Sequence, residues 1–328
     1  MPTAYVTGGS GFIGGALIER LLAEGWGVRA LARSDCAGQA VRNRGAEPVW
    51  GDLDDVEAMT EGARGANVAF HAAAHLGEWG ARSEFERGNV RGTRNALAAT
   101  RGAGVARFVH VGTEAALMNG EPLVGVDERA PLQPDSPAHY SATKAQAEMA
   151  VLAANGDGFE TVVLRPRLVW GVGDTTILPG VRAAADKGRW AWIGGGGHRT
   201  STTHVDNVIE GLWLAATKGA AGGVYFVTDG EPIVFRDFIT RLLATQGVEP
   251  GGRQLPRGAA GVVAVAGETL WRVLPLRGQP PLTRLAFWLA SQECTIDISR
   301  ARTELGYAPV KTIDEGMEDL RRAHLGRI

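Results

Sequence analysis

The chain has 328 residues, of which 45% are hydrophobic and 21% are charged, and its formal net charge is −2. This length predicts a main domain with a smaller lobe, and the balanced charge argues against a nucleic-acid partner. Two cysteines, Cys36 and Cys294, are too few for a disulfide framework or a zinc site, so we expect no bound metal. The sequence enters its first strand almost at once, which leaves no room for a signal peptide and predicts a cytoplasmic protein.

Short apolar runs alternate with helical patterns through the first 170 residues. The runs predict strands at 4–6, 28–32, 47–50, 68–71, 108–111 and 161–164, and the helical patterns predict helices at 12–23, 89–101 and 138–155. Such alternation indicates an α/β fold with a Rossmann-type, doubly wound parallel sheet.

The pattern loosens after Pro166, and residues 224–227 read as one further strand of the same sheet. We therefore predict a dinucleotide-binding domain from residues 1–171 plus about 207–230. The remaining segments, about 172–206 and 231–328, would form a smaller, mostly C-terminal α+β lobe that binds the substrate.

The first strand ends in a glycine-rich turn, TGGSGFIG at 7–14, that opens the first helix. Glycines at such a turn allow a sharp bend, a close approach to a pyrophosphate and tight helix–strand packing. The helix N-terminus offers free N–H groups to the anion. Two registers fit, one with Gly8, Gly11 and Gly14 and one that begins at Gly9.

The end of the second strand bears on the choice of cofactor. An acid there would bind the ribose 2′-OH of NAD, whereas a basic residue accepts the 2′-phosphate of NADP. This chain has Arg33 and Ser34 at that place, which favours NADP(H) and leaves NAD(H) as the alternative; Arg33 could also simply face solvent. Asp52 and Leu53 follow the third strand, where they could cover the adenine, and Asp52 could equally cap a helix.

Tyr140 and Lys144 lie four residues apart, on one face of a predicted helix. A free phenol has a pKa near ~10, and a nearby ammonium lowers that value. The pair therefore predicts an acid/base for hydride transfer chemistry. Thr113 ends the fifth strand, where its hydroxyl could hold the substrate oxygen or serve as a turn residue.

Ordered motifs carry a resemblance along almost the full chain. They are TGGSGFIG at 7–14, GDL at 51–53, FHAAA at 70–74, NVRGTRN at 89–95, FVHVGTEA at 108–115, YSATK at 140–144, LRPRLVWG at 164–171 and HVDN at 204–207. On these motifs the chain resembles the extended short-chain dehydrogenase/reductases, the NAD-dependent epimerase/dehydratase superfamily.

The resemblance implies roles for particular residues. Thr113, Tyr140 and Lys144 would be the catalytic triad, and Lys144 would also bind the ribose. The cofactor would be held by residues of the glycine turn and of the strand ends: Gly8, Gly11, Phe12, Ile13, Gly14, Ala72, Ala73, Pro166 and Val169. Asn89 matches an asparagine that anchors helices in this family, and a homodimer is implied as well.

Within the family the chain is most similar to the 3β-hydroxysteroid dehydrogenase-like branch, which includes sterol-4-carboxylate 3-dehydrogenases and 2-alkyl-3-oxoalkanoate reductases. The matching segments are GEWG at 77–80, GGGG at 194–197, PLTR at 281–284 and LGYAP at 305–309. Gly112 departs from the serine that many relatives carry, and no acid ends the second strand. These departures favour an NADPH-dependent reductase of a hydrophobic, steroid-like or 3-oxoacyl-like ketone over a decarboxylating sterol enzyme.

Two other functions fit the same scaffold. A nucleotide-sugar dehydratase would need a second acid after Glu114, where this chain has Ala115, and an epimerase would need a diphosphate-sugar site in a lobe that is rich in tryptophan (Trp190, Trp192, Trp271 and Trp288). A non-catalytic dinucleotide sensor would be expected to lack Tyr140 or Lys144.

The longest apolar stretch, residues 258–276, carries Glu268 and Arg272, which argues against stable insertion into a membrane. The longer segment 258–289 could be core of the second lobe, a lid over a hydrophobic substrate, or a peripheral membrane contact.

Overall fold

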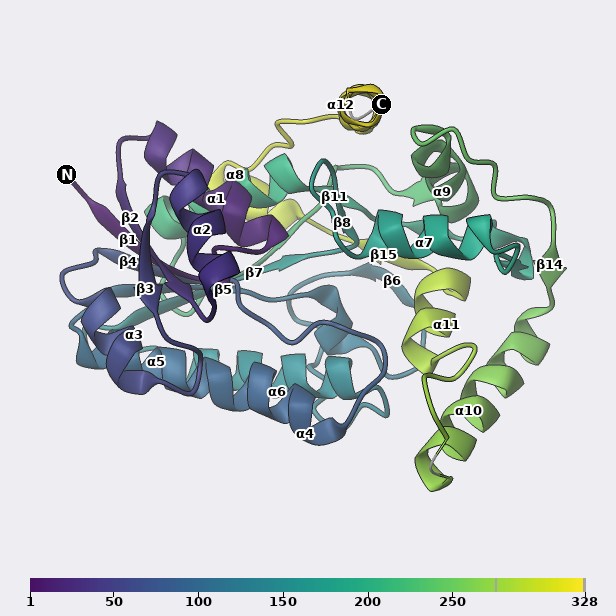
Figure 1. The fold of residues 1–328 in the computed structure, drawn as a ribbon, viewed down its shortest axis with the longest axis horizontal. Coiled ribbons are helices and arrows are strands. Elements are labelled where there is room, and N and C mark those ends of the chain that lie inside the picture. Colours follow the sequence, from purple (N-terminus) through teal and green to yellow (C-terminus); the bar gives the residue numbers. More distant parts are fainter. Residues whose placement is uncertain (275, 327–328) are drawn as a thin grey trace.

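A parallel sheet of seven strands forms the centre of the computed structural model, which describes residues 1–274 and 276–326 (Figure 1). The strand order is β12-β7-β5-β4-β1-β2-β3. The strands are β1 (Thr3–Thr7), β2 (Gly27–Ala32), β3 (Glu47–Trp50), β4 (Val68–His71), β5 (Arg107–Val111), β7 (Glu160–Pro166) and β12 (Val224–Val227). The chain adds β2 and β3 on one side of β1, and then β4, β5, β7 and β12 on the other side. The crevice between the ends of β1 and β4, where the direction reverses, is the switch point where ligands bind in such sheets.

The predicted Rossmann-type fold is confirmed, and its strands are apolar because both faces of the sheet are covered. Ala4, Tyr5 and Val6 of β1 are fully buried. In Figure 1, α1 (Phe12–Ala23) and α2 (Asp35–Asn43) lie on one side of the sheet. The opposite side carries α3 (Val56–Ala63), α5 (Gly92–Gly102) and α6 (His139–Ala153).

Helix α8 (Val205–Lys218) packs beside α1, on the same side of the sheet. The predicted helix at 89–101 begins instead as a π-helical turn, η1 (Glu86–Arg91), that follows the short α4 (Arg82–Phe85) and runs into α5. Predicted and observed strand limits differ by no more than two residues at either end, because each apolar run is bounded by turn residues.

The second lobe has a four-stranded sheet in the order β13-β10-β15-β6, with helices around it. Its strands, with the short pairs β11-β8 and β14-β9, are β6 (Leu123–Val126), β8 (Val169–Trp170), β9 (Trp192–Ile193), β10 (Arg199–Thr200), β11 (Thr203–His204), β13 (Ile233–Val234), β14 (Gln254–Leu255) and β15 (Cys294–Ile296). The remaining helices and turns are η2 (Glu114–Leu117), α7 (Ile177–Asp186), η3 (Gly194–Gly196), α9 (Phe235–Ala244), α10 (Arg257–Val273), α11 (Arg284–Ser291), η4 (Ala301–Leu305) and α12 (Ile313–Leu325).

The apolar segment 258–289 forms α10, a connecting loop and α11, which project from the lobe in Figure 1. Ala260, Ala264 and Glu268 of α10 are buried at a spacing of four residues, whereas Val262, Val265 and most of the other large apolar side chains of α10 are exposed. The segment is therefore core on one face only. Within residues 1–274 and 276–326, no helix has the length and hydropathy needed to cross a membrane.

Candidate active site

The glycine turn is closed by contacts that leave no space for side chains. Gly8 has a φ of +77°, and a Cβ there would lie 2.6 Å from the backbone nitrogen of Ala73. A Cβ on Gly14 would lie 2.2 Å from the carbonyl oxygen of Gly8, and Gly11 donates its N–H to that same oxygen at 2.9 Å. These contacts favour the register with Gly8, Gly11 and Gly14. Gly9 instead lets α1 pack on β2.

The start of α1 suits a diphosphate. Gly11 is the N-cap, and among the described residues no side chain caps this helix. The backbone N–H groups of Phe12 and Ile13 lie in the first turn of α1, where the positive end of the helix dipole attracts an anion. Ala72 and Ala73 are half-buried and cross the turn, where Ala72 donates its N–H to Thr7 at 3.1 Å. The residues of the turn fit a dinucleotide pyrophosphate.

The tip of β2 leaves Arg33 exposed, and within the described part of the chain its guanidinium has no hydrogen bond or ion pair. Ser34 caps α2 and accepts from the Ala37 N–H at 3.3 Å, so its hydroxyl already has a structural role. Arg33 is therefore an exposed charged side chain next to the tip of β2, and the NADP(H) preference stays a prediction.

The loop after β3 corrects one alternative. Asp52 does not cap α3: the N-cap is Asp55, whose carboxylate accepts from Ala58. Asp52 instead accepts the Asp54 N–H at 2.8 Å and remains partly exposed. Leu53 packs beside Gly92 and is held through its carbonyl, so both residues stay candidates for the adenine side of the cofactor.

Tyr140 and Lys144 occupy the first two turns of α6, and Thr113 lies directly after β5. Tyr140 is half-buried against an apolar cluster, and Lys144 is buried. The Lys144 Nζ donates to the Val111 carbonyl at 2.8 Å and lies 3.5 Å from the His110 Nε2. The three residues of the predicted triad thus meet at the carboxyl end of β5.

The electrostatics of Tyr140 differ from the expectation. Burial and the charge of Glu114 raise the pKa of Tyr140 above its usual value, although contact with the Thr113 hydroxyl lowers it in part. Lys144 does not reverse this, because its ammonium points to the end of β5. Burial lowers the pKa of Lys144 to about 8, against the charge of Glu148. The prediction of a lowered Tyr140 pKa is therefore wrong for this state of the protein.

The Thr113 hydroxyl donates its proton to Glu114 at 2.8 Å and accepts from the Ala115 N–H at 3.2 Å. Glu114 also binds the Arg167 guanidinium at 2.6 Å, and this ion pair is buried. Arg167 in turn donates to Thr200 of β10. A hydroxyl has one proton, so while Thr113 donates to Glu114 it can only accept from the neutral Tyr140 phenol; it lowers the Tyr140 pKa by turning to donate to the phenolate.

Sequence reasoning gave no role in the site to Glu114 or Arg167. The sequence does contain one indication of this pair. Glu114 directly follows Thr113 and Arg167 directly follows Pro166, so both charges lie next to buried strands. A buried charge is unfavourable unless it is paired, which indicates that each residue has an oppositely charged partner.

Two histidines lie beneath the triad. His71 bonds Thr7 at 2.7 Å and Thr93 at 3.0 Å, and its ring stacks on that of His110 with centroids 5.4 Å apart. Burial lowers the pKa of His71 to about 3 and that of His110 well below its usual value. Both imidazoles are therefore neutral and add no positive charge beside Lys144.

Asn89 connects the loop after β4 to α6. Its side chain accepts from the His75 N–H at 2.7 Å and donates to the His75 carbonyl and to Thr143. These contacts fit an anchoring role for Asn89.

The segment after β7 carries local backbone strain. Pro166 ends β7 and is buried, Val169 begins β8, and Leu168 between them has a φ of +40°. A positive φ is costly for a branched residue and is kept only where the surroundings hold it. Here the neighbours Arg167 and Val169 are held by Glu114 and by β11, respectively.

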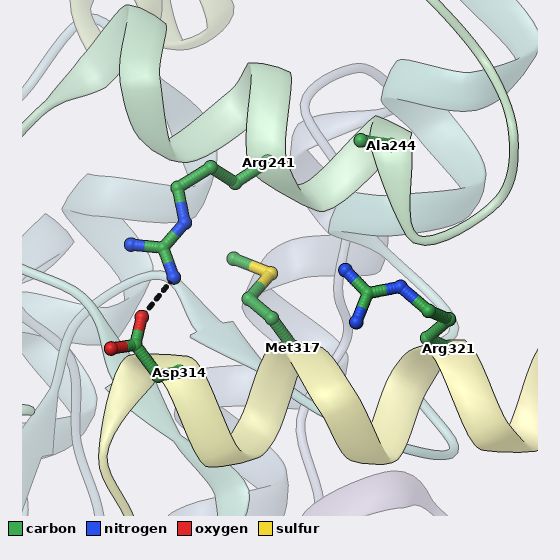
Figure 2. A pocket seen from close by; sticks show the side chains of 5 residues that line it. All are labelled: Arg241, Ala244, Asp314, Met317 and Arg321. Atoms are coloured by element: carbon green, nitrogen blue, oxygen red, sulfur yellow. Dashed lines mark hydrogen bonds and ion pairs between the residues drawn. The ribbon is translucent and has the colours of Figure 1, made fainter.

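A separate hollow lies between α9 and α12, lined by Arg241, Ala244, Asp314, Met317 and Arg321 (Figure 2). Arg241 pairs with Asp314 across it. None of the predicted catalytic or cofactor residues lines this hollow, so we do not assign it to the site. Among the residues that the structure describes, no cluster of His, Cys, Asp and Glu could hold a metal ion.

The sequence model of the 3-beta hydroxysteroid dehydrogenase/isomerase family matches residues 5–257. The chain belongs to this family. It is 48% identical to the 4-hydroxy-2-methyl-3-oxo-4-farnesyl-3,4-dihydroquinoline-1-oxide ketoreductase of Stigmatella aurantiaca, over 97% of this chain and 96% of that protein.

A second relative agrees with this assignment, and a solved structure shares the fold. A 2-alkyl-3-oxoalkanoate reductase of Stenotrophomonas maltophilia is 37% identical, over 96% of this chain and 97% of that protein. The dTDP-glucose 4,6-dehydratase of Streptomyces venezuelae has the same fold, with a TM-score of 0.77 at 22% identity over 99% and 97% of the two chains. The members of the 3-beta hydroxysteroid dehydrogenase/isomerase family named here are oxidoreductases, and so is this chain, which argues against the non-catalytic sensor.

Proposed function

We propose that the protein is an NADP(H)-preferring reductase that converts a ketone on a hydrophobic substrate to a secondary alcohol, with Tyr140 as the general acid. The observation that carries this proposal is the place of Tyr140. Its phenol contacts the Thr113 hydroxyl near the carboxyl end of β5, and its ring packs against an apolar cluster shared with α11; Lys144 follows one turn later on α6.

The apolar cluster supports the hydrophobic substrate. Around Tyr140 it includes Met118, Leu285 and Trp288, and Phe287 packs against it from α11. A ring system or alkyl chain would gain free energy by contacting such a surface, by roughly 25 cal/mol for each Å² removed from water. The relatives named above act on a farnesylated quinoline oxide and on 2-alkyl-3-oxoalkanoates, which agrees with this choice.

The protonation of Tyr140 is compatible with reduction. A phenol with its ordinary pKa of about 10 already keeps its proton at neutral pH, and ketone reduction needs such a donor. Burial and the charge of Glu114 raise the pKa of Tyr140 further, so the phenol stays protonated but is a weaker acid. A bound dinucleotide would supply the hydride. Tyr140 Oη would give its proton to the carbonyl oxygen, with the phenol oriented by Thr113. Lys144, which donates to the Val111 carbonyl, would bind the ribose.

Substitution of Tyr140 tests the chemistry. We expect Tyr140→Phe to lower kcat by about 10²–10⁴-fold, with NADPH affinity nearly unchanged, measured by NADPH oxidation on a panel of 3-oxo substrates and by fluorescence titration. A variant that keeps wild-type turnover would remove Tyr140 from the mechanism.

Arg33 tests the cofactor preference. If its guanidinium binds the 2′-phosphate, Arg33→Ala weakens NADPH by about tenfold or more, as loss of a charge-assisted bond predicts, and leaves NADH nearly unaffected. Arg29 lies within β2 and donates to the Arg64 carbonyl, so its substitution provides a control near Arg33. An equal loss for both nucleotides would refute the NADP(H) preference.

The competing dehydratase function has less support. The one acid that follows Thr113 is Glu114, which is buried and engaged by Arg167 and Thr113. An acid held in this way is poorly placed to remove a proton from a sugar, so the reductase remains the better proposal.

A further inference from the structure

Helix α10 has two faces of opposite character. The inner face packs on α11, where Ala260 and Ala264 are fully buried and Gly261 lies against the ring of Phe287. At its C-terminal end Glu268 accepts from the Arg284 N–H at 2.6 Å. The helix is thus fixed to the lobe along one side, and its other side is set by that packing.

The outer face is apolar and exposed. Of sixteen large hydrophobic side chains that are exposed among the described residues, seven lie between residues 262 and 276, and each of the seven is at least 41% exposed. They are Val262, Val263, Val265, Leu270, Val273, Leu274 and Leu276. Scattered exposed apolar residues are ordinary, but a contiguous group marks a surface that contacts something apolar.

The charges around this face have one sign. Residues 251–284 contain five arginines, namely Arg253, Arg257, Arg272, Arg277 and Arg284, and a single acid, Glu268. That acid is buried and faces Arg272 and Arg284. The chain as a whole has a net charge of −2, so this segment is a basic exception. A basic amphipathic helix with an exposed apolar face is the pattern of a helix that lies in a lipid interface.

The position of α10 connects it to the active site. Arg272 donates to the Pro137 carbonyl at 3.2 Å, three residues before Tyr140, and lies over the ring of Trp79. Thr283, just before α11, donates to Glu78 at 3.1 Å. The inner side of the α10–α11 unit therefore borders the approach to Tyr140, while its outer side is free.

We propose that the outer face of α10 docks on an anionic lipid surface. The seven exposed apolar side chains named above would enter the acyl boundary, and the flanking arginines Arg253, Arg257 and Arg277 would lie among the headgroups. Docking does not require turnover and so does not depend on the proposed function. If that function holds, docking brings the entrance of the site to the phase in which hydrophobic ketones collect.

The test is co-sedimentation of the full chain with vesicles of phosphatidylcholine, alone or with about a third of phosphatidylglycerol, since anionic lipid strengthens the attraction of basic segments. We expect binding to the mixed vesicles that weakens as salt is raised. The triple variant V262S/V265S/V273S should bind at least about tenfold more weakly, because it removes apolar surface that enters the membrane.

Two controls separate the alternatives. V124S/V310S removes exposed valines elsewhere on the molecule and should bind like the wild type. R253Q/R257Q/R277Q should reduce the preference for the anionic vesicles and leave the thermal midpoint unchanged. Tyr140→Phe should lose turnover and keep vesicle binding, so that failure of docking and failure of the proposed chemistry give different results.

Three results would overturn the proposal. The first is no binding of the wild type to the mixed vesicles at low salt. The second is equal binding by the wild type and V262S/V265S/V273S. The third is a wild-type dimer in light scattering that becomes a monomer in this triple variant, because the face would then belong to a second copy of the chain.

Discussion

The glycine turn and the outer face of α10 differ in how strongly the surrounding structure restricts which side chains they can carry. At the turn, one added carbon on Gly14 would lie 2.2 Å from a backbone oxygen. On α10, large apolar side chains contact mainly solvent. The comparison teaches that the glycine turn is determined by backbone geometry, whereas the outer face of α10 is determined by the chemistry of its exposed side chains. Mutations should therefore act through folding and cofactor binding in the first region, and through binding to a partner surface in the second.

Gly14→Ala should have the largest effect. The clash with Gly8 cannot be relieved without moving α1 or the turn, so we expect a loss of about 3 kcal/mol or more in the free energy of unfolding, together with loss of NADPH binding. Urea denaturation and fluorescence titration measure the two effects.

Gly102→Ala is the matched control for that change. Gly102 ends α5 and has open space where a Cβ would lie, so the substitution should be neutral or stabilise by about 0.5–1 kcal/mol. If Gly14→Ala bound NADPH as well as Gly102→Ala does, the glycine turn would not bind the cofactor.

Lys144 should give a pH-dependent stability. Its pKa of about 8 in the folded protein lies below the usual 10.5 of the unfolded chain, so the unfolded state binds the proton more tightly. The buried ammonium therefore destabilises the fold at low pH, and this effect fades as pH rises from about 8 to 10.5. Relative to Lys144→Met, the wild type should gain up to about 3 kcal/mol between neutral and alkaline pH.

The check is chemical denaturation of the cofactor-free wild type and Lys144→Met across that pH range. A stability difference that stays constant with pH would contradict the lowered pKa of Lys144.

Glu114→Gln should have a smaller effect, which acts through the hydrogen bond between Glu114 and Thr113 in the candidate active site. The amide can donate to Thr113 and so reverse the direction of that hydrogen bond, which we expect to lower kcat by about 10–100-fold. Loss of the carboxylate also removes a charge that raises the pKa of Tyr140, so the alkaline limb of the pH–rate profile should move to lower pH.

Glu148→Gln provides the control for charge loss. Glu148 forms a buried ion pair with Arg165 and faces Lys144, whereas Glu114 faces Tyr140. Both variants should lose stability, because each leaves an arginine buried without its partner. If the alkaline limb of the pH–rate profile moved equally in both variants, the charge of Glu114 would not be what raises the pKa of Tyr140.

The sequence predicted the first region well, for physical reasons. Strand ends and the glycine turn are local features, written in consecutive residues such as Gly8 to Gly14. The placement of Tyr140 and Lys144 one helical turn apart, with Thr113 two residues after β5, could also be predicted from local sequence, whereas their catalytic roles stay a prediction. The direction of the Tyr140 pKa was predicted incorrectly, because it depends on Glu114 and on burial, which only the assembled structure contains.

The partners of long-range contacts could not be predicted in the same way. Arg167 and Glu114 are 53 residues apart and pair only when β7 and β5 lie side by side. The two faces of α10 were also left open, because residues 258–289 carry large apolar side chains on every side of the helix pattern, and only the packing of α11 decides which side is buried.

The pairing of β6 with β15 has a consequence for protein engineering. β6 belongs to the first half of the sequence, yet its partner Cys294 comes from the last forty residues. Near the C-terminus, Tyr307 also returns to bond the Thr228 carbonyl at the end of β12. A chimaera that exchanges only the C-terminal portion would therefore join strands that never evolved together, so grafts that change substrate range should carry residues 123–126 with the lobe.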